Sequence, residues 1–164
     1  MRLKTPEQTV ATSYDEPHEV IGRFVVLCST LEYRQSQLLS RYFTPGSRVK
    51  FLSNVIHSIP AELKSEIIAE RLSLYHPKGK ELPAHVEQVG AVLARRDLAV
   101  HGVLTAVAGG YALKNLAAHP IRHNGEILDE LLVSEIPKWS QEAIRLTGET
   151  MRLAKLSEEQ AARV

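Results

Sequence analysis

The segment RRDLAVHG, residues 95–102, combines residue types that could act on a phosphate ester. Histidine exchanges a proton readily near neutral pH, so His101 could serve in acid–base catalysis. Arg96 presents a planar fork of N–H donors that suits phosphate oxygens. Asp97 precedes His101 by one helical turn, so its carboxylate could fix the imidazole tautomer. Together these residues predict proton transfer beside a bound phosphate, with Arg95 as a possible further contributor to the cleft.

The same segment also suits an ordinary helix end. Cations near a helix C-terminus complement the helix dipole, and a carboxylate one turn earlier can pair with them. On an ideal helix Arg96 and His101 point about 140° apart. They share a cleft only if the long arginine stem bends toward a helix that frays near Gly102. The residue types alone leave both interpretations open.

The other chemistry-bearing residues predict no second site. Cys28 lies in the apolar run FVVLCSTL, which favours a small buried side chain over a nucleophile. His119 and His123 have the spacing of paired metal ligands but lie in a proline-containing loop with no evident third ligand. We therefore expect no metal and no cofactor.

Helical periodicity dominates the first half of the chain. Residues 1–17 are polar and contain two prolines, so we expect an N-terminal arm. A long first helix is expected over residues 19–43, ending at Thr44-Pro45-Gly46. A second is expected after Ser47 as N-cap. A third is expected from Pro60, with its inward face formed by Leu63, Ile67, Leu72 and Tyr75.

The second half of the chain changes period twice. Residues 76–83 are expected as a loop before a helix that ends at Gly102, in the C′ position. Short apolar runs around Gly109-Gly110 predict a β-hairpin with a two-residue turn, and residues 117–126 are expected as a loop. A last helix is expected over about residues 133–156, before a tail at 159–164. Its core candidates are Ile136, Ile144, Leu146, Met151 and Leu153. The fold class is thus an all-α bundle of about five helices, the first and last longest, with a small hairpin before the last.

The placement of Arg96, Asp97 and His101 at the end of a late helix in such a bundle resembles the R-x4-6-H signature of HEPN domains (higher eukaryotes and prokaryotes nucleotide-binding). In that family a polar residue typically follows the arginine, as Asp97 does here, which favours Arg96 over Arg95. The resemblance covers residues 18–158 in architecture, although the motif spans six residues.

The resemblance implies a metal-independent endoribonuclease that works as a homodimer and leaves a 2′,3′-cyclic phosphate. Such proteins are often toxins or components of phage or stress defence, so RNA is the implied substrate and an antitoxin or operonic partner is implied. In this setting Arg96, His101 and Asp97 are the implied catalytic residues. The sequence departs from the family pattern in one position that matters for regulation. In toxins of the family that are silenced by modification of a tyrosine, the signature continues as His-x-Tyr, whereas this chain has Val103 at the tyrosine position. Tyr111 does not match the motif.

A different class of function is also open, because some HEPN domains are non-catalytic modules for dimerisation or for binding a ligand or partner. The polar break in the first helix bears on this choice. Glu32, Arg34 and Gln35 could be a solvated stretch, or could point toward the motif of the partner protomer across a dimer cleft.

Composition limits these alternatives. The chain has 164 residues, 44% hydrophobic and 24% charged, which suits one globular domain. Its net charge of +1 argues against tight non-specific binding of duplex nucleic acid. No apolar run approaches the length of a membrane span, and the N-terminus lacks a hydrophobic signal core. We expect a cytoplasmic protein with no membrane partner.

Overall fold

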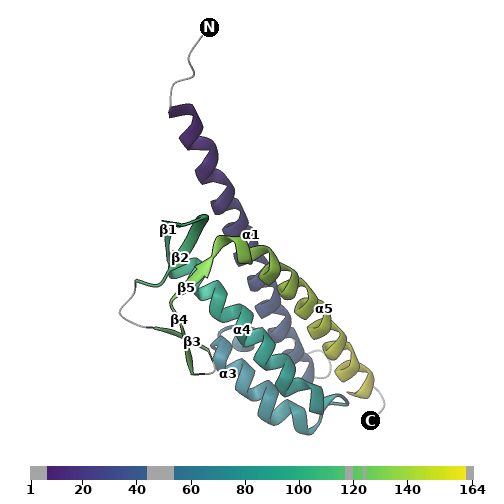
Figure 1. Cartoon of the computed structure of the whole chain (residues 1–164). Helices are drawn as coiled ribbons and strands as arrows, with labels where there is room; N and C mark the ends of the chain where they lie inside the picture. The colour runs from purple at the N-terminus through teal and green to yellow at the C-terminus, as the bar shows by residue number, and fades with distance from the viewer. Residues whose placement is uncertain (1–6, 44–53, 117–119, 124, 162–164) are drawn as a thin grey trace.

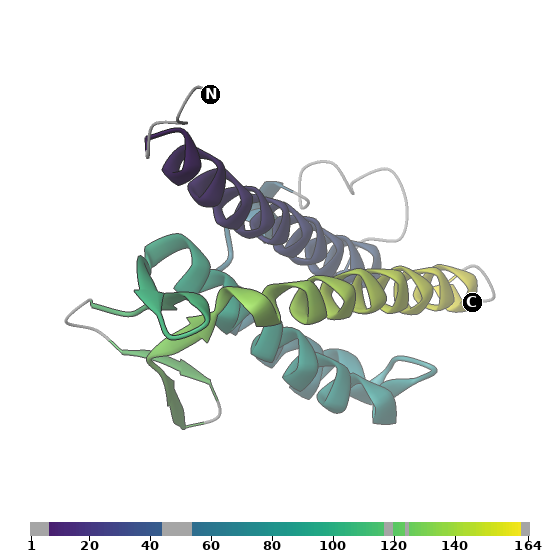
Figure 2. The same cartoon turned by 45° about the horizontal axis from the view of Figure 1, so that its top comes forward.

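The structure is a computed structural model that describes residues 7–43, 54–116, 120–123 and 125–161. Three long helices, α1, α4 and α5, form the body of the molecule (Figure 1). A small group of strands gathers at the end of the bundle where α4 ends and α5 begins, as Figure 2 also shows. The predicted mostly helical bundle with a small β element is therefore confirmed.

Helix α1, Glu7–Phe43, includes most of the segment that we expected to be an arm. The expected start near residue 18 is wrong, because the helix passes through Pro17. Proline removes one backbone hydrogen bond inside a helix and so often ends it. A helix can nevertheless continue through a proline when burial of the ring offsets that loss. Here Pro17 is buried and lines a hollow together with Val20 and the β1–β2 turn. The predicted end before Thr44 is confirmed.

The region after α1 is a broken helix. Residues 54–57 are helical, whereas the expected N-cap Ser47 lies outside the described residues. Pro60 then immediately precedes α3, Ala61–Glu66, as predicted. The chain continues through a π-helical turn, η1 (Ile67–Arg71), and a 3-10 turn, η2 (Leu72–Leu74).

The buried face of this segment differs from the expected one. Leu63 and Tyr75 are exposed, and the buried positions are Lys64, Ile68 and Leu72. The predicted face assumed an uninterrupted α-helix around apolar residues. The face that is buried in the structure contains a lysine where an apolar residue was expected. The π-helical turn also changes the rotation per residue, so the residues after it point in other directions than in an α-helix. Leu72 is buried as predicted, and Ile67 is partly buried and packs against the core.

Helix α4, Leu82–His101, follows the 3-10 turn η3, Gly79–Glu81, close to the expected start. Gly102 ends α4 but does not adopt the positive φ of a C′ glycine, since its φ is −74°. A Cβ atom there would lie 2.4 Å from the Leu98 carbonyl oxygen. Glycine is therefore required by close backbone approach and not by a left-handed conformation.

The strands form two small antiparallel sheets. Strands β1 (Val103–Val107), β2 (Gly110–Lys114) and β5 (Glu130–Leu132) pair in the order β1-β2-β5. The predicted two-residue hairpin turn is confirmed with a φ of 86° at Gly109, although it lies at Ala108-Gly109, one residue before the expected glycine pair, and Gly110 begins β2. The expected loop over 117–126 is partly wrong, because β3 (Ile121–His123) pairs with β4 (Glu126–Leu128).

Helix α5, Ile136–Ala161, follows the 3-10 turn η4 (Val133–Glu135) and extends into the segment expected to be a tail. Ile136, Leu146 and Leu153 are buried as predicted. Ile144 and Met151 are exposed, because the inward face also uses small and polar residues that a search for large apolar side chains overlooks: Ala143, Thr150, Ala154 and Ser157.

The core consists of two hydrophobic clusters. The first lies against the sheet and includes Leu31, Val89 and Leu146. The second lies at the other end of the bundle and includes Leu38, Leu82 and Leu153. On each long helix buried polar residues separate the two clusters: Gln35 and Ser36 on α1, His85 on α4 and Thr150 on α5.

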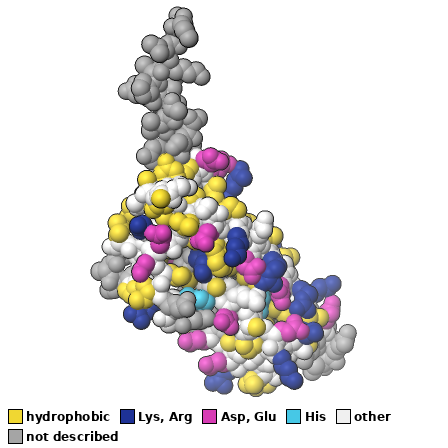
Figure 3. Space-filling view, in the orientation of Figure 1, with side chains coloured by type: hydrophobic (Ala, Val, Ile, Leu, Met, Phe, Trp, Pro, Cys, Tyr) yellow, Lys and Arg dark blue, Asp and Glu magenta, His cyan; other side chains and the backbone are white. Residues whose placement is uncertain are grey.

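The surface carries no dominant charge on the face seen in Figure 3, where basic and acidic side chains are interspersed. Among the described residues, no helix is long and apolar enough to span a bilayer.

Candidate functional site

Arg96 is held in place by carboxylates from two helices. Its Nη1 donates a hydrogen bond of 3.3 Å to Oε2 of Glu32 on α1, and its Nε lies 2.9 Å from Oδ1 of Asp97. The Nε–H does not point at Asp97, so this contact is ionic and the buried Nε–H has no hydrogen-bond acceptor within the described structure. The two carboxylates thereby fix the direction of the Arg96 side chain.

Lys64 supports this arrangement from α3. It is 1% exposed, and its Nζ lies 3.8 Å from Oε1 of Glu32 and donates to the backbone oxygen of His57 at 3.4 Å. Glu32 thus lies between two cations, Lys64 and Arg96. The sequence analysis missed Lys64, whose only signal was its i, i+4 relation to the buried Ile68.

Burial shifts the pKa of two groups around Arg96. Burial raises the pKa of Asp97 above its ordinary value, although the positive charges of Arg96 and His101 oppose the change. Burial lowers the pKa of Lys64, and the charge of Glu32 opposes that change. In both cases desolvation of the charged form is the larger effect. The neighbouring opposite charges therefore partly offset the effect of burial on the pKa of Asp97 and of Lys64.

His101 is exposed at the last position of α4. Within the described part of the chain, no hydrogen bond joins it to Asp97, so the expected fixing of the imidazole tautomer is not present in this conformation. The two side chains are near enough for the charge of His101 to lower the pKa of Asp97. Arg96, Asp97 and His101 are therefore neighbours at one helix end, with Asp97 between the other two.

Arg95 points to a different part of the molecule. Its guanidinium lies 3.6 Å from the centre of the Trp139 ring on α5, and Nη1 donates to the backbone oxygen of Ala91 at 2.8 Å. This cation–π contact joins α4 to α5. The structure does not bring Arg95 to the Arg96 side chain, so its expected contribution to the cleft is not supported.

A small cleft of about 100 Å³ opens beside Arg96 and Asp97. Its walls come from α3, α4 and β3, and it is lined by Ala61, Glu62, Ser65, Gly90, Leu93, Ala94, Arg96, Asp97, Arg122 and His123. This volume suits one charged group, such as a phosphate, rather than a whole nucleotide. His101 and Glu32 are not among the lining residues.

The polar break of α1 has a role that we did not predict. Glu32 contacts Arg96 of its own chain, whereas we expected it to face a partner's motif. Arg34 is half-buried and donates to Gln37 at 2.6 Å. Gln35 is fully buried, and its amide has no hydrogen-bond partner within the described structure, so it does not line a surface cleft.

Two other candidates from the sequence can be placed. Cys28 is buried, and burial raises the pKa of its thiol to about 12, which makes a thiolate nucleophile unfavourable at neutral pH. His123 belongs to β3, while His119 lies outside the described residues. Among the residues that the structure does describe, no three His, Cys, Asp or Glu side chains are grouped to hold a metal ion.

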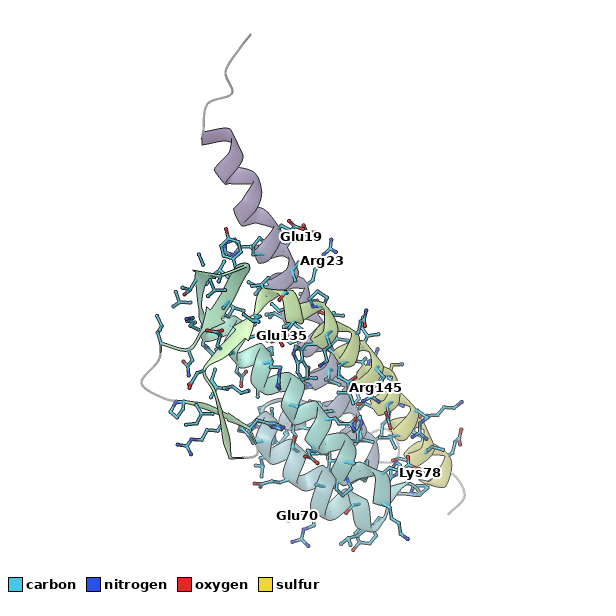
Figure 4. The ribbon with its side chains drawn as sticks, viewed as in Figure 1. Glu19, Arg23, Glu70, Lys78, Glu135 and Arg145 are labelled. Atoms are coloured by element: carbon cyan, nitrogen blue, oxygen red, sulfur yellow. The ribbon has the colours of Figure 1, made fainter. Side chains whose placement is uncertain are left out.

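A larger hollow of about 650 Å³ lies between α4 and α5. Arg145 lies at this seam (Figure 4) and contacts Glu142, Glu149 and Gln88. Arg145 is thus paired with two carboxylates of its own helix.

The chain was compared with protein-family models, with curated proteins and with solved structures. None of them matches. The function must therefore be argued from the motif and from the geometry around Arg96.

Proposed function

We propose that the protein is a metal-independent endoribonuclease of HEPN type that acts on single-stranded RNA. The observation that carries the proposal is the helix end at which Arg96 is oriented by Glu32 and Asp97 beside an exposed His101. A guanidinium fixed in this way presents remaining N–H donors in a defined direction, which is what stabilisation of a phosphorane requires.

The reaction needs no group beyond these side chains and the RNA. The ribose 2′-oxygen attacks the adjacent phosphorus while its proton passes to a base, and the bond from phosphorus to the 5′-oxygen breaks. His101 is the proposed acid–base group, and Arg96 is proposed to stabilise the phosphorane charge. Asp97 is proposed to orient Arg96, which it contacts, and the imidazole of His101. A toxin or defence role, with an antitoxin or operonic partner, belongs to the same proposal.

We also propose that the active form is a C2 homodimer. Val100 and Val103 flank His101 and are about half exposed, at 51% and 48%. An isologous contact through these side chains would bury them and bring the two His101 residues near one axis. Light scattering at micromolar concentration is expected to give twice the monomer mass, and a Val100→Lys variant is expected to give the monomer mass.

The activity is tested with a single-stranded RNA in the presence of EDTA. His101→Ala is expected to lose about 10²- to 10⁴-fold in rate, the usual contribution of a positioned proton-transfer group. Arg96→Lys is expected to be impaired because it keeps the charge and loses the fork. His18→Ala changes another exposed histidine and serves as the control. Products should end in a cyclic phosphate, and a 2′-deoxy residue at the cut should block cleavage.

A non-catalytic HEPN module is the alternative. It is favoured by one observation, namely that Arg96 already has two carboxylate partners. That alternative predicts no cleavage by the wild-type protein and unchanged dimerisation in both variants. Cleavage that requires magnesium, or that survives His101→Ala, would refute the ribonuclease proposal.

A further inference from the structure

The β3–β4 hairpin brings a second histidine to the cleft. His123 and Arg122, adjacent in β3, both line the cavity that Arg96 and Asp97 also line. The contact between His123 and α4 occurs at Gly90, which precedes Asp97 by seven residues and therefore lies on nearly the same side of the helix.

Gly90 provides the space that the imidazole occupies. A Cβ atom on Gly90 would lie 2.9 Å from Cε1 of His123 and 3.3 Å from its Nδ1. Any residue larger than glycine at position 90 would therefore clash with the imidazole unless the imidazole moved. The absent side chain at position 90 thus allows His123 to lie against α4 at the cleft.

The position of His123 argues against a role at the cut itself. Gly90 and His101 are eleven residues apart, which is about 16 Å along an α-helix. That separation is too long for both imidazoles to act on one phosphodiester. It does suit an RNA strand lying along α4, with a phosphate further along the strand at β3.

We propose that His123, together with Arg122, binds a backbone phosphate of single-stranded RNA further along the strand from the one that is cut. This inference rests on the proposed function for the identity of the ligand. The small cleft is lined by two donors suited to one phosphate, the guanidinium of Arg122 and the imidazole of His123, and Arg96 also lines it. Asp97 and Glu62 also line it, and the contact of Asp97 with Arg96 partly neutralises one of these two negative charges.

The test measures binding separately from cleavage. The probe is a short fluorescein-labelled RNA with 2′-O-methyl riboses, which bind through phosphates but cannot attack them. Fluorescence anisotropy is expected to give a dissociation constant about tenfold higher for His123→Ala, the loss typical of one hydrogen bond to a charged group. For Arg122→Ala, the slope of log affinity against log salt should fall by about 0.7, as expected for one single-strand phosphate contact.

Gly90→Ala is the more specific variant, because it changes neither the histidine nor the arginines. It should weaken binding about as much as His123→Ala, and combining the two changes should cause no further loss, since both act through the same imidazole. Gly148→Ala is the matched control, because Gly148 is also helical and has nothing within 4 Å of an added Cβ. Its affinity should equal that of the wild type.

The outcomes separate this inference from the proposed function. Wild-type affinity in His123→Ala, or additive losses in the double variant, would overturn the inference even if the protein cleaves RNA. Loss of binding in His123→Ala and Gly90→Ala, in a protein that never cleaves RNA, would support the phosphate site and refute the ribonuclease proposal. Absence of any RNA binding by the wild-type protein would overturn both.

Discussion

The ion pair between Lys64 and Glu32 allows a quantitative prediction. Changing Glu32 to Gln keeps the shape of the side chain but removes the charge that lies 3.8 Å from Lys64 Nζ. At an effective dielectric constant of about 20, two charges at this distance attract by about 4 kcal/mol. Breaking a buried pair typically costs about 3–5 kcal/mol, and breaking an exposed pair costs about 0–1 kcal/mol.

Glu32 lies between these limits, because its side chain is 27% exposed whereas that of Lys64 is 2% exposed. We therefore expect Glu32→Gln to lower the free energy of unfolding by about 2 kcal/mol near neutral pH. For a domain of this length that corresponds to a fall in Tm of about 4–8 °C. Urea unfolding followed by circular dichroism measures the first quantity, and calorimetry measures the second.

The pH dependence of this loss identifies its cause. Burial depresses the pKa of Lys64 from its ordinary value of 10.5, so between the depressed value and 10.5 the unfolded chain binds more protons than the folded chain. The contribution of Lys64 to the free energy of unfolding therefore rises with pH in that window. Once Lys64 is neutral, the charge of Glu32 no longer stabilises it. The deficit of Glu32→Gln should accordingly shrink between about pH 7 and about pH 10.

A double-mutant cycle provides the control. Lys64→Met removes the buried charge, and we expect Glu32→Gln to cost at least about 1 kcal/mol less in that background. The residual cost would reflect the contact with Arg96. A loss that is the same with Lys or Met at position 64, and the same at both pH values, would refute this account of the site.

Three further predictions concern the core. Leu146→Ala should lower the free energy of unfolding by about 2–5 kcal/mol, whereas Ile144→Ala should change it by less than about 0.5 kcal/mol. The reason is that Leu146 is buried and Ile144 is 58% exposed. Equal losses in urea unfolding of the two variants would contradict this assignment of the inward helix face. Cys28, with a pKa of about 12 and a buried thiol, should react with a thiol reagent only after unfolding, so rapid reaction of the native protein would exclude its burial. Burial is the main reason why the pKa of His85 is lowered from 6.5, so below pH 6.5 the unfolded chain binds more protons than the folded chain and the free energy of unfolding should fall as pH drops. His85→Leu should flatten this pH dependence in urea titrations. An unchanged slope would contradict the assignment of the effect to His85.

The parts of the fold that could be predicted are those set by local chemistry. Gly109 needs a positive φ, Pro60 suits a helix start, and the apolar spacing of the long helices is regular, so the hairpin and the three long helices could be recognised. Pro17 misled the prediction because its destabilising effect on a helix is local, whereas the burial of its ring depends on the tertiary fold.

The parts of the site that could not be predicted depend on tertiary contacts. Arg96, Asp97 and His101 are close because they share a helix end, which sequence spacing reveals. Lys64 gave no such signal, because a lysine is ordinarily a surface residue and its burial depends on Glu32 from another helix. His123 likewise reaches the cleft only because a glycine two turns before Asp97 leaves space for it, a relation that no local pattern encodes.

The division of the core into two hydrophobic clusters has a consequence for partial unfolding. Gln35, His85 and Thr150 interrupt apolar packing at one level of the bundle, where Gln35 and the Nδ1 of His85 have no hydrogen-bond partner among the described residues. Cooperative unfolding units tend to separate where apolar contacts are few. We expect amide hydrogen exchange to show two levels of protection, with the η1–η2 end opening while the sheet end remains folded. The backbone amides around Arg96 belong to the sheet end, so the helix end with His101 would persist through these openings.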